Sequence, residues 1–141
     1  MINDDLKLTG ALTIALNDEI VQKTKNLVVT AGKNWVASRM KDTTQDAMSH
    51  MAVGTGTTVA AAGNTTLVTE NDRNALTSTT VTGNAIAYVA TWAAGDGTAA
   101  LTEAGIFDAA SGGDMLCRTV FSVVNKGSAD SMTITWTITV S

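Results

Sequence analysis

The stretch MTITWTITV, residues 132–140, alternates apolar and hydroxyl-bearing side chains along its whole length. Successive side chains of a β-strand point to opposite faces of the sheet, so this alternation predicts a strand that is buried on one face only. The threonines would face outward and the apolar set would face a core. The apolar positions are Met132, Ile134, Trp136, Ile138 and Val140.

Shorter stretches of the same kind precede it, separated by glycine, asparagine or aspartate. A turn about every 8–12 residues is typical of an antiparallel sandwich or barrel. We therefore predict a mainly β protein: one antiparallel, jelly-roll-like β-sandwich domain over residues 1–141, with about seven or eight strands. The expected strands are 8–16, 19–25, 50–56, 76–83, 84–95, 101–107, 115–124 and 132–140.

Two segments depart from this alternation. TAGKNWVASRMKD, residues 30–42, predicts the one short helix, near residues 30–41, with Thr30 as its N-cap. Its apolar face is modest, so we expect it to cover an edge or an end of the sheets. Residues 57–75 predict a long loop with one helical turn near residues 67–73.

The alternating positions also predict which side chains form the interior. We expect a single core to which most strands contribute one or more apolar residues. The expected members are Leu12, Ile14, Ile86, Tyr88, Trp92, Phe107, Phe121, Ile134, Trp136 and Ile138.

Composition limits the function. The chain has 141 residues, a net charge of −4 and only 16% charged residues, with no basic cluster. This disfavours binding to nucleic acid or to an anionic membrane. The N-terminus, MINDDLK, lacks the features of a signal peptide, and no apolar run approaches the length of a membrane span, so we expect a soluble protein. Residues 1–7 are expected to form an extended arm.

Low charge also predicts self-association. A surface of threonine and alanine is more typical of a protein that packs against a second subunit than of a monomer in solution. Leu116, Val120 and Val124 are expected to point outward beside Arg118, where the helix or another subunit must cover them. We expect a homo-oligomer, either a trimer or a dimer.

Three acids lie in or beside the hairpin LTEAGIFDAASGGDMLCRTVF, residues 101–121. Asp108 and Asp114 flank the turn, where aspartate caps backbone amides. Glu103 is expected to pair with an arginine, either Arg118 or Arg73. This structural interpretation is favoured over acid–base work of the glycosidase type, since little else in the sequence supports hydrolysis.

The other candidate chemistry is weaker. VGTGTTVAAAG, residues 53–63, lacks the Lys-Ser/Thr of a phosphate-binding loop. His50 has no second histidine for a metal site, and Cys117 predicts a small buried hydrophobe. The acids at 3–5 lack the spacing of a calcium loop. We expect no catalytic, cofactor-binding or metal-ligating residues, no cofactor and no enzymatic activity.

From about residue 8 to its end, the chain resembles small virion structural proteins of tailed bacteriophages. The most specific part is Glu-Ala-Gly-Ile-Phe-Asp, residues 103–108, with its Gly-Gly turn, followed by the tryptophan-containing last strand. Related patterns are found in tail-collar and tail-fibre attachment proteins. The resemblance implies a β-sandwich that assembles into a virion and has no catalytic residues to carry over.

A compact acidic domain is more typical of a head protein than of a tail fibre, which is normally long. We expect a capsid cement or decoration protein, located in the virion and assembled in the host cytoplasm, that stabilises the finished head by bridging capsomers. Its partner would be the major capsid protein or another virion protein, contacted through residues 1–7 and the loop 54–74. The alternatives are a neck, tail-collar or tail-fibre adaptor and, third, a glycan-binding jelly roll.

Overall fold

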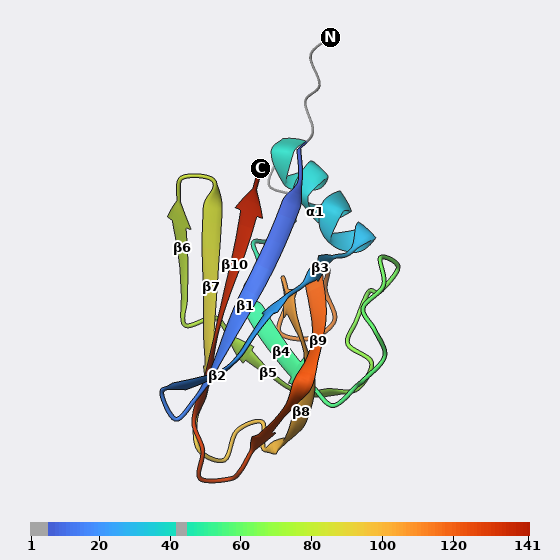
Figure 1. Ribbon diagram of the computed structural model, residues 1–141. Helices are drawn as coiled ribbons and strands as arrows, with labels where there is room; N and C mark the ends of the chain where they lie inside the picture. The colour runs from blue at the N-terminus through green and yellow to red at the C-terminus, as the bar shows by residue number, and fades with distance from the viewer. Residues whose placement is uncertain (1–5, 42–44) are drawn as a thin grey trace.

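The computed structural model describes residues 6–41 and 45–141, and it confirms the β-sandwich. Two antiparallel five-stranded sheets face each other, with one helix at the end where β1 begins (Figure 1). The first sheet has the order β2 (Glu19–Lys25), β1 (Leu8–Leu16), β10 (Met132–Val140), β7 (Ala85–Trp92), β6 (Ser78–Thr82). The second has the order β3 (Leu27–Val28), β9 (Met115–Lys126), β8 (Ala99–Phe107), β4 (His50–Gly54), β5 (Glu70–Ala75).

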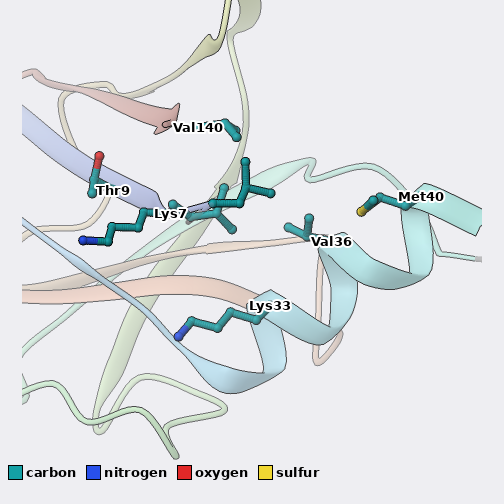
Figure 2. A pocket seen from close by; sticks show the side chains of 8 residues that line it. Lys7, Thr9, Lys33, Val36, Met40 and Val140 are labelled. Atoms are coloured by element: carbon teal, nitrogen blue, oxygen red, sulfur yellow. The ribbon is translucent and has the colours of Figure 1, made fainter. Parts of the chain in front are cut away.

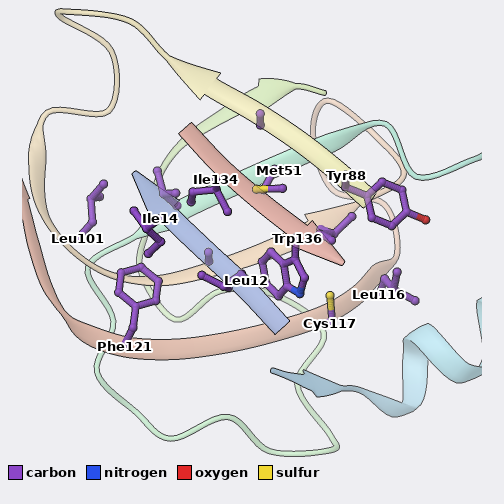
Figure 3. Packing of buried hydrophobic residues seen from close by; sticks show 14 of the residues in the cluster. Leu12, Ile14, Met51, Tyr88, Leu101, Leu116, Cys117, Phe121, Ile134 and Trp136 are labelled. Carbon is purple, nitrogen blue, oxygen red and sulfur yellow. The ribbon is translucent and has the colours of Figure 1, made fainter. Parts of the chain in front are cut away.

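The stretch that predicted the fold lies at the centre of the first sheet. β10 pairs with β1 on one side and β7 on the other, so that Trp136 lies opposite both Leu12 and Tyr88. Its apolar residues from 132 to 138 are buried and its threonines are only partly buried, as the alternation predicts. Val140, at the end of the strand, is exposed. Figure 3 shows Trp136 among the apolar side chains of the main cluster between the sheets.

The described residues form ten strands, two more than expected. β3 has two residues, and β5 occupies Glu70–Ala75, where a loop with a helical turn was expected. The helical turn is wrong. The sequence of β5, ENDRNA, is polar because β5 is an edge strand that pairs only with β4, so it carries no apolar alternation.

The expectation of one interior is wrong for Phe107. Nine of the ten expected core residues belong to or pack against the main cluster, Ile86 being partly buried there. Phe107 instead lies in a second, smaller cluster with Val29, Ala52, Leu67 and Met115. Its neighbour in β8, Ile106, belongs to the main cluster, so β8 is buried on both faces and consecutive residues enter different cores.

The helix α1 (Thr30–Lys41) covers the end of the sandwich beside β9 (Figure 1). A Cβ atom at Gly32 would overlap the backbone carbonyl of Leu116, so glycine allows the helix to approach β9 this closely. Trp35 packs against the main cluster, and its indole N–H donates to the Asp46 carbonyl at 2.8 Å. Leu116 and Val124, expected to point outward, are buried in the main cluster.

Candidate functional site

Glu103, the first acid of the hairpin, is fully buried and has its carboxylate oxygens occupied. They accept hydrogen bonds from the backbone N–H groups of Gly56 (2.7 Å), Val68 (2.9 Å) and Thr69 (2.8 Å). The guanidinium of Arg118, also fully buried, lies 3.0 Å away as an ion pair. Burial raises the pKa of Glu103, but the three amides and Arg118 outweigh it and hold that pKa below its usual value. The pairing with Arg118 is confirmed, and the alternative with Arg73 is wrong.

Arg118 extends the same network. Besides Glu103, it donates to the Asn64 side-chain oxygen at 3.1 Å and to the Thr58 carbonyl at 2.9 Å. Glu103 and Arg118 therefore hold the loop 55–69 against the second sheet at five residues of that loop. In the glycine-rich stretch 53–63, the Gly56 amide donates to the carboxylate of Glu103.

This corrects the expected loop 54–74. Gly54 lies in β4 and residues 70–74 lie in β5, so only 55–69 connects the strands. Leu67 is buried in the second cluster, which anchors the loop further. A loop held in this way presents a fixed surface and has little left to order on contact with a partner.

The other two acids shape the hairpin turn, as expected. The Asp114 backbone N–H donates to the Asp108 carboxylate at 2.7 Å, and Gly112 and Gly113 have φ angles of 64° and 74°. Positive φ is a conformation that glycine adopts at little cost.

Arg73 holds this turn from the neighbouring β5. Its guanidinium donates to the carbonyls of Ala109 and Gly112 at 2.9 Å each, pairs with Glu70 at 2.7 Å and lies 3.7 Å from the Phe107 ring centroid. Sequence reasoning missed this role because it depends on the pairing of β5 with β4.

His50 lies opposite Phe107 in the β4–β8 pair, and Cys117 precedes Arg118 in β9. The Nδ1 atom of His50 is 2.7 Å from the Ser49 hydroxyl. Cys117 is fully buried in the main cluster, and burial raises the pKa of its thiol well above the usual value. Within 6–41 and 45–141, no three His, Cys, Asp or Glu side chains are grouped to hold a metal ion. The acids at 3–5 lie outside the described residues.

Sequence reasoning also missed a buried lysine. Lys126 is 2% exposed, and its ammonium donates to the Ala93 carbonyl at 3.0 Å. Nothing in its sequence neighbourhood distinguishes it from a surface lysine.

None of the helices in the described part of the chain has the length and hydropathy to cross a membrane.

Two surface features remain that the network does not use. The first is a groove of roughly 510 Å³ between α1 and the ends of β1 and β10, lined by Leu6, Leu8, Val36 and Val140 among others. Figure 2 shows Lys7 and Lys33 on one side of it and Met40 on α1 at the other. Lys7 also pairs its backbone with Ser141, which ends the expected arm 1–7 before this residue.

The second feature is the outward side of the first sheet, here called the threonine–alanine face. On β1, β10, β7 and β6 every outward position is threonine, alanine, serine or valine. Charges appear only on the edge strand β2, at Lys23 and Lys25, which pair with Thr13 and Ala11. The face comprises Thr9, Ala11, Thr13, Ala15, Ser78, Thr80, Thr82, Ala85, Ala87, Val89, Thr91, Thr133, Thr135, Thr137 and Thr139.

Comparisons of the chain with protein-family models, with curated proteins and with solved structures found no match.

Proposed function

We propose that the protein is a bacteriophage virion structural protein, most specifically a cement or decoration protein that stabilises an assembled head by bridging capsomers. The observation that carries the proposal is the threonine–alanine face, which covers four adjacent strands without a charged side chain. Small-domain surfaces normally carry interspersed charges. A face without them is suited to contact with another protein.

The buried network supports the same role. Glu103 and Arg118 hold the loop 55–69 in place, and Asp108 and Arg73 hold the turn between β8 and β9. This is consistent with a structural, non-catalytic protein and with the phage-like hairpin 101–121, whose Glu103, Asp108 and Arg118 serve the framework. The proposed partner is the major capsid protein or another virion protein, and the proposed location is the virion.

Binding only to the assembled lattice would stabilise the shell by mass action, and attachment to several capsomers would strengthen weak individual contacts. We propose that the protein does this as a homo-oligomer.

A neck, tail-collar or tail-fibre adaptor is the alternative function, and a glycan-binding jelly roll is the third candidate.

The test is to purify particles of the phage whose genome encodes the chain and to count its copies per particle by gel densitometry. Hundreds of copies per particle support a cement protein, whereas a copy number equal to the few subunits of one small ring supports the adaptor. Absence from the particle contradicts both, and binding of host polysaccharide by the isolated protein would then favour the third candidate.

A surface variant tests the face itself. Thr135→Lys places a charge at the centre of the threonine–alanine face, and we expect it to fold normally but to lose binding to particles stripped of the protein. Ser128→Lys, in the exposed turn between β9 and β10, is the control and should bind as before. Equal binding by both variants would show that attachment uses another surface.

A deletion tests the N-terminal arm. Because Lys7 pairs with Ser141, deletion of residues 1–5 leaves every described backbone hydrogen bond intact. We expect an unchanged melting temperature and weaker attachment to particles. Normal attachment would exclude the arm as a contact.

A further inference from the structure

The two sheets end in four edge strands, and three of these edges carry features that oppose pairing with another strand. Charged side chains, short length and irregular pairing all prevent edge-to-edge association. β3 has only two residues. β2 has a register irregularity against β1 and carries Glu19, Lys23 and Lys25, and β5 carries Glu70, Asp72 and Arg73.

The fourth edge, β6, carries none of these features. Its sequence is Ser-Thr-Thr-Val-Thr, all five residues are exposed, and its pairing with β7 is regular. No Asp, Glu, Lys, Arg or His occurs between residues 74 and 95, so the whole β6–β7 hairpin is uncharged. Figure 1 shows β6 as the outermost strand of the first sheet, on the side opposite β2.

One apolar side chain on this edge is left uncovered. Val81 is 69% exposed, and it lies opposite Ile86 of β7, which is partly buried against the main cluster. Val81 therefore extends the apolar side of the sheet beyond the part that α1 and the second sheet cover. A further strand beside β6 would bury it.

We propose that β6 pairs with β6 of a second copy of this chain, antiparallel and about a two-fold axis at Thr80. Thr80 then lies opposite Thr80 of the second copy, Ser78 opposite Thr82, and Thr79 opposite Val81. The first sheet continues across the axis as one ten-stranded sheet. Each Val81 gains a cross-strand neighbour, and the two threonine–alanine faces join into one.

Charge and symmetry indicate that the partner of the β6 edge is a second copy of the chain. A two-fold axis sets each edge residue against the same set in the other copy, so a charged edge would bring like charges together. The uncharged edge of β6 avoids this repulsion even though the chain has a net charge of −4. In the proposed register Thr80 faces Thr80, Ser78 faces Thr82 and Val81 faces Thr79, and all of these are acceptable cross-strand pairs.

This inference specifies the self-association that the proposed function includes, and it excludes a trimer as the first assembly step through this edge. It can fail independently of the proposed function, since a monomer can still bind a capsid through the threonine–alanine face.

The experiment uses Thr80→Lys and Thr80→Glu, each alone and mixed in equal amounts, with sedimentation velocity as the readout. We expect the natural chain to sediment at about twice its monomer mass of 14.5 kDa. Each single variant should weaken dimerisation roughly tenfold or more, because like charges face each other at the axis. The equimolar mixture should restore the dimer, because it pairs opposite charges.

Val21→Lys on β2, the opposite edge of the same sheet, is the matched control, and it should leave the dimer unchanged. Thermal melts of all variants separate loss of pairing from loss of folding. A natural chain that stays monomeric, single variants that dimerise normally, or a mixture that fails to recover would each overturn the inference. Particle binding by a natural chain that sediments as a monomer would leave the proposed function standing.

Discussion

Removing the charge of Glu103 is the most informative perturbation of the framework. In Glu103→Gln the side chain keeps its size and one carbonyl oxygen, but Arg118 is left as a fully buried cation whose remaining acceptors, Asn64 and Thr58, are neutral. Breaking a buried ion pair from one side costs about 3–5 kcal/mol, because the charge that remains has lost both water and its partner. For a domain of this size that loss lowers the melting temperature by about 10–17 °C.

The loss should be asymmetric and coupled. Arg118→Met leaves a carboxylate that still accepts three backbone N–H bonds, so we expect it to cost less than Glu103→Gln. The double variant should cost less than the sum of the two, since the second substitution no longer leaves an unpaired charge. Glu70→Gln, in the partly exposed pair with Arg73, is the control and should cost less than about 1 kcal/mol.

Urea unfolding followed by tryptophan fluorescence gives these free energies. Hydrogen exchange should also quicken within the set Gly56, Val68 and Thr69 in Glu103→Gln, because one of the two carboxylate oxygens that accept from these amides is replaced by an NH2 group. The reasoning is refuted if Glu103→Gln is as mild as Glu70→Gln, or if the two single effects simply add.

Four further expectations concern the pH dependence of Glu103, the approach of the helix at Gly32, the core residue Trp136 and the buried Cys117. Because the folded pKa of Glu103 is lowered, its contribution is present above its usual pKa of 4.5 and is lost as the pH falls through the folded value, so acid unfolding curves of Glu103→Gln should be flatter below pH 4.5 than those of the natural chain. Gly32→Ala should cost about 1–3 kcal/mol in urea unfolding, because its Cβ overlaps the Leu116 carbonyl, whereas Gly63→Ala, with open space around it, should be close to neutral. Trp136→Ala should cost about 3–5 kcal/mol, and an unchanged melting curve would contradict its central place in the core. Cys117 should resist alkylation by iodoacetamide until the protein unfolds, since burial raises its thiol pKa; rapid labelling of the native protein would show that β9 opens.

The sequence predicts best those elements that are buried on one side. β10 and β1 were located correctly because one face of each contacts the core and the other contacts solvent, which imposes the alternation directly. β5 escaped prediction because an edge strand of polar residues has no such contrast. β8 and β9 were located, but the sides on which Phe107 and Leu116 lie were not, because residues 103–107 and 115–119 are buried on both faces. The side of Val124 was missed because Val123 beside it is equally apolar, although Val123 is exposed.

The same distinction applies to the site. Pairing of Glu103 with Arg118 could be named as one of two options from charge alone, and the turn role of Asp108 followed from its position beside two glycines. The complete burial of Glu103 and Arg118 could not be foreseen, because it depends on the loop 55–69 closing over the second sheet. That closure is a tertiary event that no local pattern records.

The distribution of charge gives the strongest reason to connect the framework with assembly. The charged groups that contact the second sheet are used inside the protein: Glu103 and Arg118 hold a loop, and Arg73 holds a turn. The first sheet, in contrast, carries charge only on β2, and from β1 to β6 it presents hydroxyl and methyl groups alone. Charges on that outer face would cost the fold little and would favour solubility. Their restriction to the edge strand opposite β6 therefore supports the two proposed contacts, one on the threonine–alanine face and one at the β6 edge.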